Sequence, residues 1–247
     1  SEEEVLESIR LTGQRYGDQI RRVFLADGDA LVLPTRRLLS ILEAIRTHMP
    51  AVRRISSYCL PRNLRKKSQA DIDELAAAGL TMAYVGAESG DDAVLAAVSK
   101  GETFDTTCEA LDKLGTAGIT RSVMILNGLG GKALSAQHAD NSARLANATQ
   151  PEYLATLVVS FPQGEERLRA GFPGWEPLSQ HELFVEMERF LSGLELKRTV
   201  FRSDHASNWL VLKGTLGSDK ERLLQQVRQA ISAPQAAHLR PGWARGL

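Results

Sequence analysis

Short apolar runs alternate with longer segments of helical periodicity over the first two thirds of the chain. Each run is rich in β-type residues and ends in small or polar residues, and a segment with apolar positions three or four apart follows it. The unit repeats at about 30 residues, which is the size of a βα unit. Sustained βα alternation predicts an α/β fold with a parallel sheet and right-handed crossovers. The predicted strands are residues 22–26, 53–57, 81–87, 120–126 and 153–161.

The predicted helices lie between these strands, and several have clear boundary signals. Ser68 is a good N-cap for a helix that Gly79 ends, and Ser179 precedes a long helix. We also expect a short strand over residues 199–201 and a tail packed on the body with Trp243 as its anchor. The predicted helices are residues 3–16, 35–48, 69–78, 91–98, 105–115, 136–146, 180–194 and 219–231.

The chain has no low-complexity linker, so a single domain is the economical prediction. Residues 1–161 form the βα-repeat core of this prediction. Residues 162–247 supply the last barrel element, the C-terminal helices and the tail.

Composition narrows the class of protein without naming a function. Lys plus Arg and Asp plus Glu both number 30, so no net charge steers the chain toward nucleic acid or an acidic membrane surface. The apolar runs are shorter than a membrane span, and the acidic N-terminus is unlike a signal peptide. We therefore predict a cytoplasmic protein without a membrane segment. Cys59 and Cys108 have no metal-ligand spacing, so we assign no metal ligand.

Polar residues follow four successive predicted strands, and parallel α/β folds bind ligands at that end of the sheet. Each polar strand end taken alone can be explained without a ligand, as a turn, a helix N-cap at Ser89 or Asp91, or a tight glycine connection. Four in succession predict a binding rim. Its candidate residues are Asp27, Gly28, Asp29, Ser57, Glu88, Ser89, Asn127 and Gly128.

The chemistry of these residues suits a nucleoside with an amino-acid-like group. Glycine allows close backbone approach, and a carboxylate beside Gly28 can pair with an ammonium group. Glu88 with the following hydroxyl suits ribose hydroxyls, and the glycine loop after Asn127 suits the edge of a planar base. His205 lies in a polar cluster, where a structural hydrogen-bond network is favoured over a catalytic role.

Several segments resemble, in order and spacing, the motifs of radical S-adenosylmethionine (radical SAM) enzymes. They are similar to the "GGEP", "GxES" and "GxIxG" regions and to a branch related to oxygen-independent coproporphyrinogen oxidase. The segments are residues 23–31, 84–91, 126–131, 201–208 and 240–243.

The resemblance implies a partial TIM-like (βα)₆ barrel that binds S-adenosylmethionine at the carboxyl ends of its strands. Residues 27–29 would meet the methionine amino group. Glu88, with Ser57 or Ser89, would lie near the ribose, and the backbone at Asn127 and Gly128 would flank the adenine.

The chain departs from that family at the cluster motif. In the family, a [4Fe-4S] cluster on a CxxxCxxC loop after the first strand reduces the cofactor to a 5′-deoxyadenosyl radical. This sequence has no CxxxCxxC, and helix 3–16 corresponds to the first helix of the barrel. We therefore expect the first strand and cluster loop upstream, a cluster in the full-length protein, and no cluster or activity in these 247 residues. The alternative is a degenerate member that has lost the cluster.

Two other functions remain open. One is a cluster-free α/β module that binds a nucleoside-like ligand or a protein partner. The other is a conventional barrel enzyme using Asp27, Glu88 and His205 in acid–base chemistry. The sequence predicts no substrate. An exposed edge at residues 22–26 leads us to expect strand pairing there with upstream residues or another chain.

Overall fold

The computed structural model describes residues 1–26, 28–161 and 164–245. In these ranges, seven strands form one sheet in sequence order, from β1 to β7. The pairs β1–β2, β2–β3 and β5–β6 are parallel, and β7 is antiparallel to β6. The predicted α/β class is confirmed. The strands are β1 Arg22–Leu25, β2 Arg54–Cys59, β3 Leu80–Glu88, β4 Thr120–Asn127, β5 Tyr153–Val158, β6 Val200–Ser203 and β7 Leu212–Thr215.

The helices begin where the sequence supplies caps. Ser1, Ser68 and Ser179 each form a capping box that satisfies free backbone groups of the first turn, as predicted for Ser68 and Ser179. Among the described residues, no helix is both long and apolar enough to cross a membrane. The helices are α1 Glu2–Tyr16, α2 Thr35–His48, α3 Pro61–Leu64, α4 Gln69–Ala77, α5 Asp92–Ala97, α6 Phe104–Thr116, α7 Gly131–Thr149, α8 Glu166–Gly171, α9 Gln180–Gly193 and α10 Lys220–Ser232.

Two compact units make up the chain. The first unit comprises Ser1–Gly86 and Glu109–Ser122, and the second comprises Ala87–Cys108 and Val123–Leu247. The expected division into residues 1–161 and 162–247 remains a prediction.

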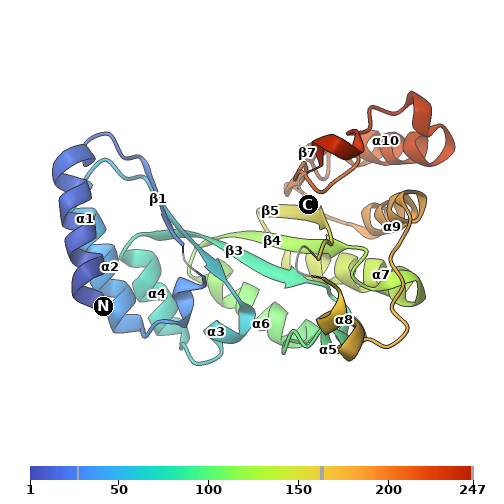
Figure 1. Ribbon diagram of the computed structural model, residues 1–247. Coiled ribbons are helices and arrows are strands. Elements are labelled where there is room, and N and C mark those ends of the chain that lie inside the picture. Colours follow the sequence, from blue (N-terminus) through green and yellow to red (C-terminus); the bar gives the residue numbers. More distant parts are fainter. Residues whose placement is uncertain (27, 162–163, 246–247) are drawn as a thin grey trace. The chain divides into compact units, whose positions relative to one another are not determined.

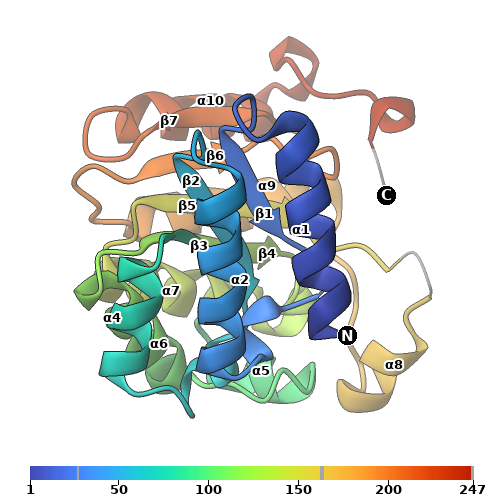
Figure 2. The ribbon, with the colours of Figure 1, turned by 90° about the vertical axis from the view of Figure 1, so that its left-hand side faces the viewer.

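In the first unit, α2 contacts both α1 and α4. Helix α2 packs on α4, and both bury apolar residues such as Ile41 and Leu75. Figure 2 shows α1 and α2 side by side. A Cβ added to Gly13 of α1 would lie 2.4 Å from the carbonyl oxygen of His48, so glycine permits this close helix contact.

In the second unit, α9 packs against both α7 and α10 (Figure 1). It buries the apolar residues Leu183, Phe184, Met187, Phe190 and Leu191. Strand β7 was not predicted, because Lys213 and Gly214 interrupt its apolar pattern.

The prediction that Trp243 anchors the tail is wrong, because this side chain is 88% exposed. Arginines hold the tail instead. Arg240 Nη1 donates to the carbonyl oxygens of His205 and Asn208, and the Arg245 guanidinium lies 3.8 Å from the centre of the Trp209 ring.

Candidate functional site

A glycine loop connects β4 to α7 in the second unit and is held by a buried carboxylate. Gly128 has φ 84°, a left-handed conformation that glycine adopts readily. Its N–H donates to Glu186 Oε1 at 2.6 Å, and the Ser135 hydroxyl donates to Glu186 Oε2 at 2.6 Å. Glu186 of α9 therefore joins the start of the loop to the first turns of α7.

Burial raises the pKa of Glu186 to about 7, although hydrogen bonds from Ser135, Gly128 and Asn127 act in the opposite direction. Glu186 is 2% exposed. Sequence analysis missed this residue. Its signal was a carboxylate on the apolar face of the predicted helix 180–194, between Leu183 and Phe190.

Asn127, at the end of β4, presents an unused acceptor. The residue is 4% exposed, and its side-chain Oδ1 is buried without a hydrogen-bond partner among the described residues. Its backbone carbonyl accepts from Val159 N at 2.9 Å. A ligand that donates one hydrogen bond would satisfy Oδ1.

The next residue, Gly128, lines a pocket of about 420 Å³ in the second unit. This volume is within the usual range for small-molecule sites. The walls are mainly apolar and include two aromatic side chains, Phe161 and Trp175, whose ring centroids lie 5.5 Å apart. Glu165 and Arg245 supply charge, so the pocket combines flat apolar walls with polar groups.

A buried histidine connects the ends of β3 and β4. Ser89 Oγ lies 2.7 Å from His138 Nδ1, and His138 Nε2 lies 3.0 Å from the carbonyl oxygen of Leu126. Burial lowers the pKa of His138 to about 4, so the ring is neutral. Because a carbonyl only accepts, Nε2 donates to Leu126 and Nδ1 accepts from the Ser89 hydroxyl. His138 was not among the residues singled out from the sequence.

Glu88 ends β3 in an unusual conformation. Its φ of 65° is uncommon for a residue with a side chain, and such conformations concentrate at functional sites. Its carboxylate lies 2.9 Å from Lys100 Nζ. The sequence also allowed Ser89 or Asp91 to be the N-cap of the next helix. Asp91 is the N-cap of α5, whereas the Ser89 hydroxyl bonds to His138.

Gly28, Asp29 and Ser57 belong to the first unit, and Asp27 lies outside the described residues. Gly28 has φ 102°. Asp29 accepts from Leu31 N at 2.9 Å, from Asn63 Nδ2 at 2.6 Å, and from the N–H of Leu60. It therefore ties the segment after β1 to the loop after β2.

Ser57 is fully buried, and its hydroxyl donates to the carbonyl oxygen of Tyr58 at 2.9 Å. His205 Nδ1 lies 2.9 Å from Ser207 Oγ and accepts from Ser207 N at 3.1 Å. This confirms the structural hydrogen-bond network that the sequence favoured for His205.

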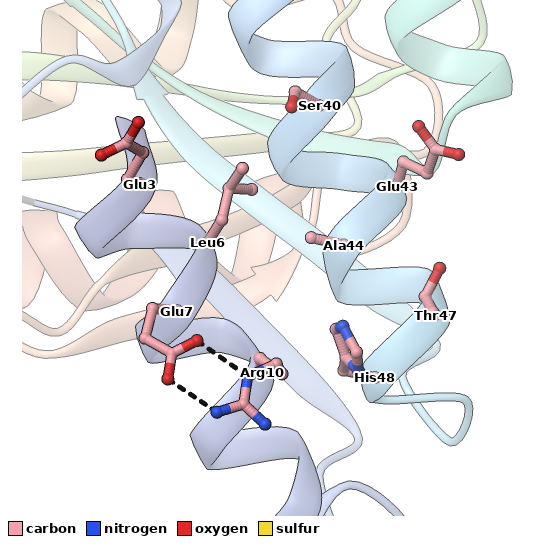
Figure 3. A pocket seen from close by; sticks show the side chains of 9 residues that line it. All are labelled: Glu3, Leu6, Glu7, Arg10, Ser40, Glu43, Ala44, Thr47 and His48. Carbon is pink, nitrogen blue, oxygen red and sulfur yellow. Dashed lines mark hydrogen bonds and ion pairs between the residues drawn. The ribbon is translucent and has the colours of Figure 1, made fainter. Parts of the chain in front are cut away.

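A surface groove of about 490 Å³ lies between α1 and α2 (Figure 3). Glu7 and Arg10 form a bidentate pair in it, with both N–O distances at 2.7 Å. None of the predicted site residues that the structure describes lines this groove, and it lies on helices rather than at strand ends.

The family model of the Radical SAM superfamily matches residues 1–146, more than half of the chain. The chain belongs to the radical SAM superfamily. This assignment confirms the resemblance carried by the polar strand ends. Members of the superfamily catalyse radical-based reactions, and the family implies S-adenosylmethionine and a [4Fe-4S] cluster. No curated protein matches the chain significantly.

Solved radical SAM structures share the fold. Coproporphyrinogen III oxidase from Escherichia coli is 12% identical with a TM-score of 0.61, over 77% of this chain and 45% of that one. Elp3 from Methanocaldococcus infernus is 12% identical with a TM-score of 0.58, and the match covers 94% of this chain and 58% of Elp3. Methylornithine synthase is 15% identical with a TM-score of 0.52, and the match covers 77% of this chain and 54% of the synthase. The partial TIM-like barrel is thus confirmed, and the chain spans about half of these relatives' length.

The residues present do not fit the iron–sulfur cluster of the family. The chain has two cysteines, Cys59 and Cys108, whereas such clusters require a larger set of thiolates. Over the described ranges, no group of three or more His, Cys, Asp or Glu side chains could hold a metal ion. Within the described residues, Asn127 Oδ1 is an unused acceptor, and the next residue, Gly128, lines the pocket of about 420 Å³.

Proposed function

We propose that this chain is the cofactor-binding part of a radical SAM enzyme and that its second unit holds the nucleoside of S-adenosylmethionine. The buried, unpartnered Oδ1 of Asn127 carries the proposal. A buried acceptor without a donor costs about 1–3 kcal/mol. The exocyclic amino group of adenine would recover that cost by donating to Asn127.

The pocket beside Gly128 supports the same ligand. Its apolar wall includes Phe161, whose ring packs edge-to-face against the buried Trp175, and an aromatic wall suits a planar base. The Glu88 carboxylate would accept hydrogen bonds from the ribose hydroxyls. The hydrogen bond between Ser89 and His138 would hold the end of β3 in position. Lys100, whose Nζ lies 2.9 Å from Glu88 Oε1, would hold that carboxylate in position for the ribose.

For the methionine part of the cofactor we propose residues 27–29, as the resemblance to the family implies. Because Asp29 already accepts three hydrogen bonds, its role would be to fix the backbone at Gly28, whose amide and carbonyl groups would meet the amino acid. Ser57 would support this end of β2 from its buried position.

A matched pair of nucleosides tests the adenine contact. We expect the chain to bind 5′-deoxyadenosine more tightly than 5′-deoxyinosine, which carries an oxygen in place of the amino group. Asn127→Ala should remove the preference, and Asn147→Ala in α7 should leave it intact. Equal binding of both nucleosides by the folded wild-type chain would contradict the assignment.

We propose that the thiolates for the [4Fe-4S] cluster come from residues outside these 247. The coding sequence upstream of Ser1 tests this directly. A CxxxCxxC motif there would support a complete enzyme, and the longer protein, reconstituted without oxygen, should release 5′-deoxyadenosine. An in-frame start without cysteines would instead favour a degenerate, cluster-free module.

Two further proposals concern the cellular location of the protein and the pairing of its first strand. We propose a cytoplasmic location and pairing of the β1 edge with upstream residues or a second copy. The first strand in the sheet order is β1, which pairs with β2. Monomeric behaviour of both the chain and its longer form, with rapid amide exchange at β1, would contradict edge pairing.

A further inference from the structure

Three aromatic side chains form a cluster across neighbouring strands of the first unit. The ring centroids of Phe24 and Tyr58 lie 4.7 Å apart, and those of Phe24 and Tyr84 lie 5.5 Å apart. Phe24 is 40% exposed and Tyr58 is 48% exposed. Alternate residues of the same strands, such as Ile55 and Val85, are buried. The aromatic rings therefore lie on the open face of β1 to β3.

Two arginines, Arg22 and Arg54, lie on this face of the sheet. Arg22 and Arg54 are direct partners in the parallel β1–β2 pairing, which places both on the face that carries Phe24. Like charges directly opposite each other destabilise a sheet. Among the described residues, neither guanidinium has a carboxylate within ion-pair distance. Arg54 Nη1 lies 4.0 Å from Met82 Sδ, and its Nε is buried without a hydrogen-bond partner in the part of the chain that the structure describes.

We propose that this arginine–aromatic face binds an aromatic carboxylate. The ring of the ligand would stack on Phe24, Tyr58 and Tyr84, and its carboxylate would accept hydrogen bonds from Arg22 and Arg54. The spacing fits one molecule, because residues two apart in a strand are separated by about 7 Å. The carboxylate would remove the repulsion between the arginines and satisfy the buried Nε.

The inference deepens the proposed function and rests on it in one respect: in a radical SAM enzyme this ligand would be the substrate. The binding itself requires neither S-adenosylmethionine nor a cluster. All the residues involved belong to the first unit, whereas Asn127 and the pocket lined by Gly128 belong to the second. Binding of the aromatic carboxylate can therefore be measured even if the nucleoside does not bind, and the reverse also holds.

The test compares 2-naphthoate with 2-naphthamide, which has the same ring system without the charge, in titrations of the 247-residue chain. We expect naphthoate to bind about tenfold more tightly, the ratio given by one charge-assisted hydrogen bond. Arg22→Gln and Arg54→Gln should each reduce this preference, and added salt should weaken it. Tyr58→Leu should weaken both ligands.

Arg36→Gln is the matched control, because it removes the same charge from an exposed position on α2. Arg54→Met, an apolar replacement beside Met82, provides a second variant if Arg54→Gln unfolds. Equal affinity for the two ligands would overturn the proposal. So would a preference that survives the loss of both arginines, or one that Arg36→Gln abolishes.

Discussion

The buried carboxylate of Glu186 gives a quantitative prediction about pH and stability. Between pH 4.5 and about 7, the unfolded chain has lost a proton that the folded chain retains on Glu186. Stability contributed by this residue therefore falls as pH rises through that window. The pKa interval corresponds to on the order of 3 kcal/mol in the free energy of unfolding.

His138 has the opposite effect. Its pKa is about 4 in the folded chain against an ordinary value of 6.5, so the unfolded chain binds the extra proton between these values. Stability contributed by His138 rises with pH over that window, again by on the order of 3 kcal/mol. The two residues therefore largely cancel in the wild-type protein between pH 4.5 and 6.5.

Glu186→Gln should expose the slope due to His138, because glutamine keeps an acceptor for Gly128 N and does not ionise. We expect the variant to gain stability from pH 4 to 6.5, where the wild type changes little. At pH 8 the variant should exceed the wild type by up to about 3 kcal/mol, less any hydrogen-bond loss.

Urea unfolding followed by tryptophan fluorescence measures this effect. All three tryptophans belong to the second unit, which also contains Glu186 and His138. Glu188→Gln is the matched control, because this neighbour on α9 is paired with Arg228 at 2.7 Å near the surface. Parallel pH profiles for the wild type and Glu186→Gln would refute the reasoning.

Three further predictions use the same unfolding assay. Gly128→Ala should destabilise the second unit by about 1 kcal/mol or more, because alanine disfavours a positive φ and its Cβ would approach a leucine methyl at 3.0 Å; an unchanged midpoint would contradict this. Ser89→Ala should lower the free energy of unfolding by about 1–3 kcal/mol, because His138 Nδ1 loses its donor. An unchanged free energy of unfolding would mean that another group donates to His138. Trp243→Ala should change the free energy of unfolding by less than about 0.5 kcal/mol, whereas Trp175→Ala should lower it by about 3–5 kcal/mol. Equal losses would refute the assignment of the tail contacts.

The elements that the sequence predicted well are those with strong local signals. The five predicted strands and the caps at Ser68 and Ser179 follow from residue periodicity and short-range hydrogen bonds. Strand β7 was missed because it pairs with β6 despite carrying Lys213 and Gly214, so its formation depends on a neighbour rather than on its own pattern. Trp243 was misassigned because apolar character alone does not show where a tail residue lies.

The candidate site was predicted only in part, because part of it depends on contacts between distant segments. The polar strand ends at Glu88 and Asn127 are visible in the sequence as interruptions of apolar runs. The residues that hold them, His138 and Glu186, lie on helices far along the chain, and their partners are set by tertiary packing. Buried ionisable residues of this kind become recognisable only once the surrounding side chains are placed.

The most direct test of the account is calorimetric titration of the 247-residue chain with S-adenosylmethionine. The account predicts saturable one-to-one binding that Asn127→Ala abolishes or strongly weakens and that Asn147→Ala leaves unchanged. A folded wild-type chain that releases no binding heat at millimolar ligand, or an Asn127→Ala variant that binds as tightly as the wild type, would contradict it.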